Sequence, residues 1–336
     1  MLLILLWAFL FQATADINFN AEIQKVLTIH EQAKSYSEWK LNDYYPAHKL
    51  KDLYQSAIKK ESTEQYCNTL LSLSELELYF LDSFLIAEKT ISKTCHQKVT
   101  QRLLSFRTLK TKHLKTYIQK NYMPTKPRLH SKELYVDPTG GKILYDGQLS
   151  DNHFLLTFDD GPHPRVTPKI LKTLESNKTL SQFFIVGNRV QYWPELLKQV
   201  QQQGHVVGNH SWSHPDMRKL SLGEAVSQIQ NTFSEIEKVL GPSEPFFRFP
   251  YGAYNFDQLE YLGQQNVVSF FWNIDTFDWK IKDPEELLKF SIKKIKEKPS
   301  GIILMHDIHN QTADMLPYLL DYLNSRSAQT VIFKSN

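Results

Sequence analysis

The pattern of apolar and polar positions changes at about residue 150. Before that point, apolar residues recur three and four positions apart, as in Leu50, Leu53 and Ala57, which places them on one face of a helix. Residues 16–122 contain no glycine, a residue that weakens helix interiors. We therefore predict a separate all-α domain of three to five helices over residues 16–122.

From residue 154 onward, short apolar runs alternate with amphipathic stretches. Strands and helices that alternate in this way, with almost continuously apolar strands, predict a parallel sheet covered by helices. About seven strands are enough to close a distorted barrel, in which catalytic groups gather at the carboxyl ends of the strands. The predicted strands are 154–158, 182–186, 205–209, 246–250, 267–274, 301–305 and 329–333, and the predicted helices are 168–174, 194–202, 221–240 and 284–297.

Prolines and a pair of glycines, Gly140 and Gly141, separate the two halves of the chain. Such residues interrupt helical periodicity and mark turns and loops. We interpret residues 123–150 as a linker or lead-in segment. Residues 151–336 would then form the second domain, which contains the candidate catalytic residues.

Residues 1–15 have the features of a secretory signal peptide. An unbroken apolar run over residues 2–11 is followed by Ala13-Thr14-Ala15, a small-x-small cleavage site, although no lysine or arginine precedes the run. The run is too short to span a bilayer as a helix, so we predict no transmembrane span. The mature chain would begin near Asp16 and act in the periplasm, outside the cell or at the cell wall.

Cys67 and Cys95 are the two cysteines of the chain. Export to an oxidising compartment favours a disulfide between them. A single helix running from Cys67 through residues 74–88, with a hairpin near residue 90, would instead hold them farther apart than a disulfide tolerates. The sequence leaves their pairing open.

The charge is unevenly distributed along the 336-residue chain, whose formal net charge is +3. Residues 16–128 hold 18 basic and 12 acidic side chains, whereas the remainder holds 21 and 24. The segment 89–128 has 11 lysines and arginines, no acidic residue and one apolar face, which predicts a solvated basic helix that packs on its bundle. The alternative is a surface that attracts anionic polymers or an anionic membrane, with nucleic acid the poorest candidate for an exported protein.

Two adjacent carboxylates, Asp159 and Asp160, stand where the first predicted strand of the second domain ends in a Gly-Pro turn. Successive side chains on an extended backbone point in opposite directions, so we expect the two to have different tasks. One would bind a metal and the other would handle a proton. Taken alone, the same residues would form an ordinary turn.

Ionisable side chains also follow the later strands. His210 and His214 lie four residues apart and can reach one ion from one turn of the chain. With a carboxylate from another strand end they would form a His-His-Asp set, which holds zinc and leaves its fourth position open for water. The strand-end sequences are Thr-Phe-Asp-Asp-Gly-Pro at 157–162, His-Ser-Trp-Ser-His at 210–214, Arg-Phe-Pro-Tyr-Gly at 248–252, Asp-Thr-Phe-Asp-Trp at 275–279 and Leu-Met-His-Asp at 304–307.

In this order, the five sequences resemble the motifs of polysaccharide deacetylases of the NodB-homology type, carbohydrate esterase family 4. The resemblance covers residues 154–333, a little over half of the chain, and does not extend to residues 16–122. It implies an α/β fold, a distorted (β/α)7 barrel of the NodB-homology type. It also implies a metal-dependent hydrolase that acts on non-peptide carbon–nitrogen bonds.

The resemblance further implies that Asp160, His210 and His214 hold the divalent metal. Zinc (Zn²⁺) is the first expectation, and other divalent ions such as Co²⁺ would also be accepted. A water on this metal would attack the acetamide carbonyl while Asp159 acts as the general base. Arg248 would pair with Asp159 and keep it charged and oriented.

His306 would be the general acid that protonates the leaving nitrogen, and Asp278 would fix its orientation and favour its protonated form. The backbone N–H of Tyr251 would stabilise the oxyanion. Trp279 and Leu304 would wall the pocket that takes the acetyl methyl group. All of these roles are carried over from the resemblance.

The expected partner is an acetylated glycan polymer of a cell envelope. We predict peptidoglycan N-acetylglucosamine, because export and a basic N-terminal domain agree with a polymer that carries carboxylates. Chitin oligosaccharides and poly-N-acetylglucosamine are the close alternatives, and a glycan-binding envelope adaptor with incidental hydrolysis is an alternative of a different class. Candidates for stacking on sugar rings are Tyr192, Trp193, Trp212, Tyr254 and Phe277.

Overall fold

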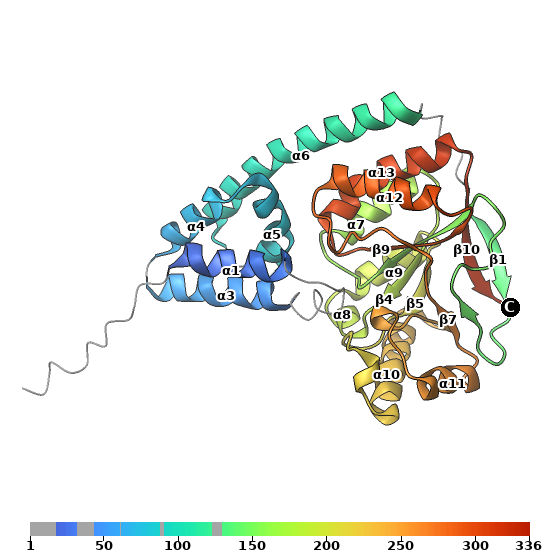
Figure 1. Cartoon of the computed structure of the whole chain (residues 1–336). Helices are drawn as coiled ribbons and strands as arrows, with labels where there is room; N and C mark the ends of the chain where they lie inside the picture. Colours follow the sequence, from blue (N-terminus) through green and yellow to red (C-terminus); the bar gives the residue numbers. More distant parts are fainter. Residues whose placement is uncertain (1–17, 32–43, 61, 88–90, 123–129) are drawn as a thin grey trace, which may run out of the picture.

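The computed structural model describes residues 18–31, 44–60, 62–87, 91–122 and 130–336. A bundle of N-terminal helices lies beside a barrel of strands and helices (Figure 1). The predicted signal peptide, residues 1–15, lies outside the described residues. Within the described ranges, none of the helices combines the length and the apolar character needed to cross a membrane.

The N-terminal helices pack around a shared apolar core, which confirms the all-α prediction for this region. Ile23, Leu50, Leu70 and Val99 come from four different helices, and each is completely buried. The apolar residues that recur three and four positions apart in the sequence therefore face the inside of the bundle. The helices are α1 (Phe19–Glu31), α3 (Tyr44–Lys59), α4 (Thr63–Ser72), α5 (Glu75–Ala87) and α6 (Lys93–Tyr122).

The turn between α4 and α5 settles the pairing of the cysteines. Ser74 and Glu77 form a capping box: the Ser74 N–H donates to the Glu77 carboxylate at 2.8 Å, and the Glu77 N–H donates to the Ser74 hydroxyl at 3.3 Å. A new helix therefore begins after Leu73, and α4 does not continue into α5. Cys67 on α4 and Cys95 on α6 form a disulfide, with 5.7 Å between their Cα atoms.

Parallel strands form the barrel, as predicted. In the order β8-β9-β3-β4-β5-β6-β7-β2, each strand pairs in parallel with the next, and β10 pairs with β3 and β1. The strands are β1 (Lys132–Val136), β2 (Ile143–Leu144), β3 (His153–Asp159), β4 (Gln182–Ile185), β5 (Val206–Asn209), β6 (Phe246–Phe247), β7 (Val268–Phe270), β8 (Ile274–Asp275), β9 (Gly301–His306) and β10 (Gln329–Ser335).

Helices cover the outside of this sheet (Figure 1). Leu156 and Phe158 of β3 are buried in one apolar cluster with Leu288 and Leu316, which come from helices on the barrel surface. Alternate residues of β3 point into the barrel, where the polar groups lie. The helices are α7 (Thr167–Ser176), α8 (Gly187–Tyr192), α9 (Pro194–Gln202), α10 (Leu222–Leu240), α11 (Phe256–Gln264), α12 (Pro284–Lys296) and α13 (Asn310–Ser325).

Some segments differ in detail from the sequence prediction. The predicted strand 267–274 is divided into β7 and β8, because the Asn273 side chain between them donates to Ser300 O at 3.2 Å and accepts from Ile302 N–H at 2.9 Å. The predicted strand 329–333 is β10. It pairs with β1 and with the first residues of β3, beside the strands that form the barrel. Residues 123–150, expected as a linker or lead-in, contain β1 and β2.

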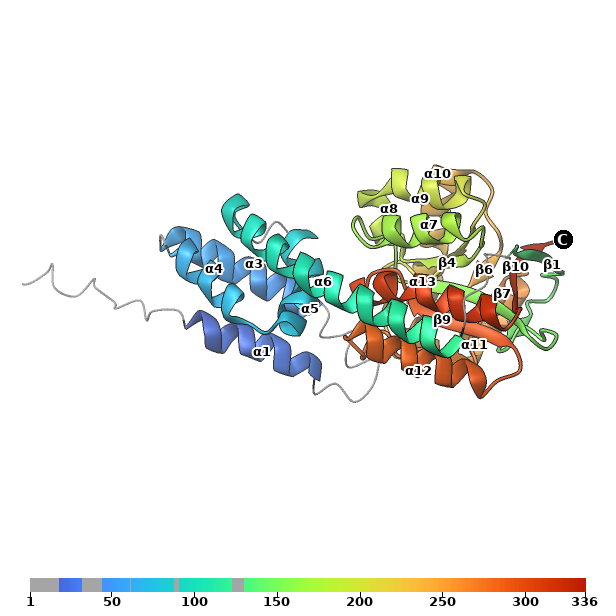
Figure 2. The same cartoon turned by 90° about the horizontal axis from the view of Figure 1, so that it is seen from above.

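Helix α6 continues from the bundle onto the barrel, where it lies along α12 and α13 (Figure 2). Its Leu114 and Ile118 are buried in the apolar cluster of the barrel. On the same half of α6, Lys110 pairs with Asp283, and His113 Nδ1 lies 3.3 Å from the Glu285 carboxylate. The basic segment thus packs on its bundle, as predicted, and also binds the acidic start of α12.

Asp82 on α5 connects the bundle to the loop that follows β3. Its side chain is 1% exposed and lies 3.0 Å from the guanidinium of Arg107 and 3.1 Å from that of Arg165. Asn310, at the start of α13, donates to the same carboxylate at 3.3 Å. Burying a carboxylate is unfavourable unless such charges and hydrogen bonds replace its hydration. The contact therefore fixes the loop after β3 against the bundle.

Replacing Asp82 by alanine is expected to lower the free energy of unfolding by about 3 kcal/mol, because two partly buried guanidinium groups would lose their carboxylate. Urea unfolding of the full chain measures this change. Glu195→Ala is the control, since its exposed pair with Lys198 should change stability by less than about 1 kcal/mol. An Asp82→Ala variant as stable as the control would contradict the prediction.

Candidate active site

Asp160, His210 and His214 are brought together at the carboxyl ends of β3 and β5. All three side chains are buried, and one ligand atom from each lies within 4.8 Å of the others. The Asp160 Oδ1 atom is 3.1 Å from His214 Nε2 and 3.6 Å from His210 Nε2. This cluster matches the predicted ligand set and could hold a metal ion.

The backbone at the strand ends separates the two adjacent carboxylates. Asp160 has a positive φ of 78°, and its N–H donates to Phe184 O at 3.1 Å. This turn of the chain directs Asp160 to the histidines, whereas Asp159 stays on the strand. His214 also has a positive φ of 58°, so the histidine pair is held by an irregular loop and not by a helical turn.

The hydrogen bonds of His210 fit a metal ligand. Its Nδ1 lies 2.7 Å from Arg248 O. Because a carbonyl only accepts, Nδ1 carries the hydrogen, and the lone pair of Nε2 faces Asp160. Burial lowers the pKa of His210 and so favours its neutral, ligating form. Ligating histidines commonly donate their second N–H to a carbonyl in this way, so the donor set fits a zinc-like divalent ion.

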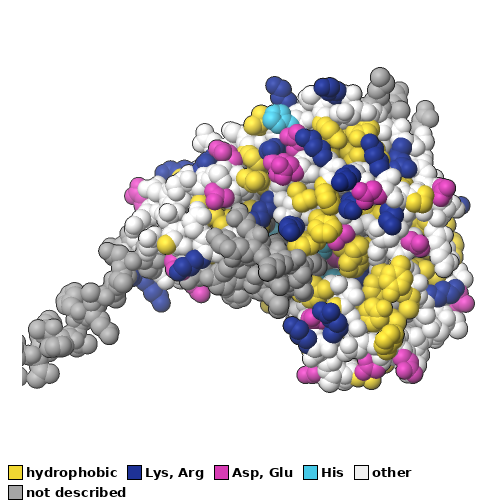
Figure 3. Space-filling view, in the orientation of Figure 1, with side chains coloured by type: hydrophobic (Ala, Val, Ile, Leu, Met, Phe, Trp, Pro, Cys, Tyr) yellow, Lys and Arg dark blue, Asp and Glu magenta, His cyan; other side chains and the backbone are white. Residues whose placement is uncertain are grey.

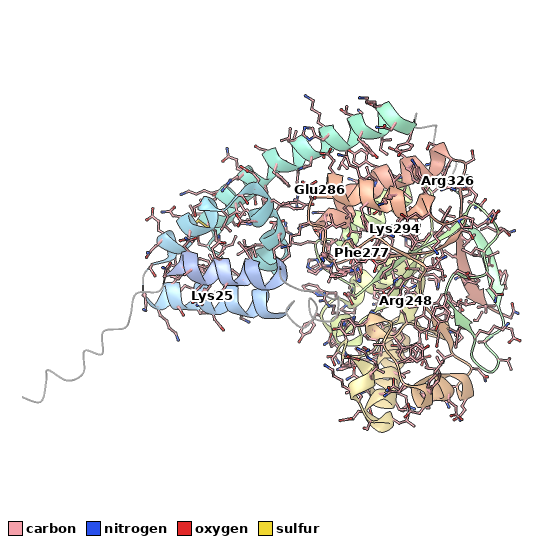
Figure 4. All side chains as sticks on the ribbon, viewed as in Figure 1. Lys25, Arg248, Phe277, Glu286, Lys294 and Arg326 are labelled. Atoms are coloured by element: carbon pink, nitrogen blue, oxygen red, sulfur yellow. A yellow bond between two sulfur atoms is a disulfide. The ribbon has the colours of Figure 1, made fainter. Side chains whose placement is uncertain are left out.

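Asp159 is bound on its other side by Arg248, which is completely buried inside the barrel (Figure 4). One guanidinium nitrogen, Nη1, donates to Asp159 Oδ1 and to the Thr157 hydroxyl, both at 2.7 Å. The other, Nη2, donates to Phe271 O at 3.1 Å, and the guanidinium carbon lies 4.1 Å from the centre of the Phe184 ring. The predicted ion pair is thus present and fixed in orientation, which leaves Asp159 Oδ2 facing the metal-ligand cluster.

His306 is the direct neighbour of Asp159 in the sheet, since the two residues are paired in the register of β3 and β9. Its Nδ1 and its backbone N–H each lie 2.7 Å from the Asp278 carboxylate. Burial alone would disfavour the charged imidazolium, but the charge and hydrogen bond of Asp278 and the nearby carboxylates together raise the pKa of His306 to about 9. These carboxylates therefore favour the protonated form of His306.

Helix α13 supports this pair. The Thr312 hydroxyl donates to the Asp278 carboxylate at 2.6 Å, and the Gln311 side chain donates to Asp278 O at 2.8 Å. Sequence reasoning missed these two residues, because nothing in their local pattern links them to residue 278. The five motifs marked only the strand ends, whereas these supports come from the start of a helix.

The remaining predicted residues also lie at this end of the barrel. Leu304 is two residues before His306 on β9 and therefore shares its inward face, and Trp279 is buried directly after Asp278. Burial raises the pKa of Asp275, the register partner of Leu304, to about 6. Tyr251 has a positive φ of 61°, and its ring lies 4.6 Å from that of His214.

Asp307 is a further buried carboxylate that the sequence reasoning gave no role. Its Oδ2 accepts from the Thr167 hydroxyl at 2.5 Å. A Cβ on Gly161 would lie 2.1 Å from Asp307, so the Gly161 position requires glycine for this close approach. Burial raises the pKa of Asp307 to about 7. Asp307 thus connects the loop after Asp160 to the strand that ends in His306.

Comparison with known proteins agrees with this geometry. The profile of the family described as polysaccharide deacetylase matches residues 146–269. The chain is 30% identical over 328 residues to peptidoglycan-N-acetylmuramic acid deacetylase PdaC of Bacillus subtilis, covering 94% of this chain and 66% of that protein. It is 31% identical over 195 residues to a peptidoglycan-N-acetylglucosamine deacetylase of Bacillus cereus, covering 57% and 70% respectively.

A solved structure, a peptidoglycan deacetylase of Bdellovibrio bacteriovorus, matches 95% of this chain and 96% of its own with a TM-score of 0.80 and 24% identity. The bundle and barrel therefore occur together in another protein as one fold. The chain spans about two thirds of the length of the two curated relatives, 66% and 70%. With the five motifs assembled at one end of a parallel barrel, the chain belongs to the polysaccharide deacetylase family of the NodB-homology type.

Proposed function

We propose that this protein is an exported, zinc-dependent deacetylase of peptidoglycan that removes the acetyl group from N-acetylglucosamine units. The observation that carries the proposal is the neighbouring position of two oriented pairs, Asp159 with Arg248 and His306 with Asp278, beside the metal-ligand cluster. One pair presents an oriented carboxylate as the proposed base, and the other presents an imidazole with a raised pKa as the proposed acid. Amide hydrolysis requires both functions.

A zinc ion held by Asp160, His210 and His214 would polarise the acetyl carbonyl and lower the pKa of a water. Asp159 would accept the proton of the attacking water through its Oδ2, while Arg248 holds Oδ1 and fixes the orientation of the carboxylate. The Tyr251 backbone N–H is the proposed donor to the oxyanion. Leu304 and Trp279 would bound the small pocket for the acetyl methyl group.

His306 distinguishes amide from ester hydrolysis in this proposal. An amine does not leave unless its nitrogen is protonated, whereas an alcohol depends less on a strong acid. A buried imidazolium with a pKa of about 9 supplies that proton at neutral pH. The protonated state of His306 therefore supports N-deacetylation.

The proposed sugar is a unit of the peptidoglycan polymer. The two curated relatives are described as acting on N-acetylmuramic acid and on N-acetylglucosamine of peptidoglycan. We choose N-acetylglucosamine because it is also the unit of the close alternatives, chitin oligosaccharides and poly-N-acetylglucosamine. The adaptor alternative is less favoured, because the acid, the base and the metal ligands are all assembled.

The reaction is tested by acetate release from peptidoglycan sacculi, chitin oligomers and poly-N-acetylglucosamine. We expect release from sacculi to be fastest, to stop with a chelator and to fall by at least about a thousandfold in Asp159→Asn, which lacks the base. Identification of the deacetylated sugar after muramidase digestion distinguishes glucosamine from muramic acid. Release that persists in Asp159→Asn, or an envelope phenotype unaffected by this substitution, would favour a different mechanism or the adaptor.

Metal binding is tested without turnover. Replacing His214 by alanine is expected to weaken zinc binding by at least about tenfold, because one of three protein ligands is lost. Zinc content and competition with a chromogenic chelator measure the affinity. His153→Ala is the control, since this histidine lies at the opposite end of β3. Equal zinc affinity in both variants would exclude His214 as a ligand.

The pH dependence of kcat/KM tests the role of His306 as the general acid. Asp278→Asn removes the charge that raises the pKa of His306, so burial would then lower that pKa. His306 would lose its proton at lower pH. The alkaline limb of the kcat/KM profile is therefore expected to shift to lower pH by more than about one unit. Asp321→Asn on α13 is the matched control and should leave the limb in place. An unmoved limb in Asp278→Asn would exclude His306 as the acid that titrates there.

A further inference from the structure

Helix α6 has one buried face and one exposed face along its whole length. On the buried face, Val99 and Phe106 lie in the apolar core of the bundle, and Leu114 lies in that of the barrel. At 3.6 residues per turn, the exposed lysines and leucines fall within the opposite half of the helix circumference. We call this surface the outer face of α6, and these residues are Lys93, Lys98, Leu104, Leu109, Lys112, Lys115 and Lys120.

The outer face of α6 carries positive charge without a compensating acidic side chain. The sequence of the helix contains neither aspartate nor glutamate. Basic residues that point toward the protein are paired there, as Arg107 is with Asp82 and Lys110 is with Asp283. In contrast, none of the five outer lysines forms an ion pair with a described residue. Their charges therefore remain available to a partner outside the chain.

The outer face of α6 is long and continuous. The helix has 30 residues, which at 1.5 Å per residue extend over about 45 Å. Figure 3 shows lysine and arginine side chains along the upper edge of the molecule, where Figure 1 places α6. Because the first half of the helix packs on the bundle and the second half on the barrel, this surface spans both domains.

Two exposed leucines favour a bilayer over an anionic polymer as the partner. Leu104 is 65% exposed and Leu109 is 50% exposed, and lysines lie on the same face in front of and behind them. An anionic bilayer presents charged headgroups above an apolar layer of acyl chains, which matches lysines with apolar side chains between them. An anionic polysaccharide offers charges to the lysines but no continuous apolar layer to the leucines.

We propose that the outer face of α6 binds the headgroup surface of an anionic phospholipid bilayer. This inference does not depend on the proposed function, because the outer face contains none of the catalytic or metal-binding residues. Each lysine close to such a surface strengthens attachment by about fivefold. Attachment would be peripheral and reversible. Since α12 and α13 pack against α6, it would turn this side of the barrel toward the membrane.

Binding is tested by sedimentation with large unilamellar vesicles of phosphatidylcholine, with or without about 30% phosphatidylglycerol. All proteins begin at Asp16, because the apolar run at residues 2–11 would itself bind lipid. We expect binding to the anionic vesicles only, and binding that weakens as added salt screens the charges. Replacing Lys98, Lys112 and Lys115 together by glutamine is expected to weaken this binding by about a hundredfold, because three charges are lost.

The matched control replaces Lys132, Lys142 and Lys219 by glutamine, which removes the same charge from exposed positions on other elements. This control should bind anionic vesicles to within about threefold of the unsubstituted protein. Replacing Leu104 and Leu109 by serine should weaken binding by about tenfold and leave its salt dependence in place, because no charge is lost. All variants should unfold at the temperature of the unsubstituted protein, since every substituted side chain is exposed.

Three results would overturn the proposal. The first is equal binding to neutral and anionic vesicles, and the second is an equal loss in the two lysine variants. The third is unchanged binding in the leucine variant, which would remove the reason for choosing a bilayer. Absence of vesicle binding, together with retention on lipid-free peptidoglycan sacculi that the α6 lysine variant loses, would likewise overturn it in favour of an anionic polymer.

Discussion

The geometry of the active site depends on the contacts made by the buried guanidinium of Arg248. It has no exposed surface, and its charge is compensated by Asp159 and by contact with the Phe184 ring. Its backbone oxygen accepts from His210, so one residue orients both the Asp159 carboxylate and the His210 imidazole. A buried charge with these partners is costly to move, because any displacement would leave it uncompensated. Arg248 thus connects the ends of β3, β5 and β7 through its contacts with Asp159, His210 and Phe271.

The two ion pairs of the site have different consequences for chemistry. Asp159 faces a guanidinium, which donates to one carboxylate oxygen and fixes the orientation of the side chain. Asp278 faces an imidazole, and its charge and hydrogen bond help to raise the pKa of His306 to about 9. The barrel brings these pairs together because β3 and β9 are neighbours and their last residues are in register. Asp159 and His306 are therefore separated by one strand spacing, and each has its own ion-pair partner.

Much of this site could be predicted from the sequence. Strand ends are visible locally, because an apolar run stops at a polar motif, and parallel strands place such ends at one edge. The metal-ligand cluster and both ion pairs followed from this reasoning and from the family motifs. The supports on α13 could not be predicted, because the hydrogen bonds of Gln311 and Thr312 depend on tertiary packing. Pro317 within this helix also obscured its helical pattern.

The extent of α6 was equally hidden in the sequence. Its basic side chains look solvent-facing when only their own helix is considered, yet Lys110 and His113 meet acidic groups of α12. Periodicity identifies which face of a helix is apolar but not which element covers it. The same limit applied to Cys67 and Cys95, whose pairing depends on the capping box that starts α5.

The disulfide has a consequence for where the enzyme can mature. Cys67 and Cys95 are 28 residues apart in the sequence, and the segment between them contains α5. This helix carries Asp82, which pairs with Arg165 in the loop after Asp160. Closing a loop of this length restricts the unfolded ensemble and favours the folded bundle. In a reducing compartment the crosslink would be absent, and the bundle would hold that loop less firmly. The loop after Asp160 would thus be held most firmly once the chain has met an oxidising environment.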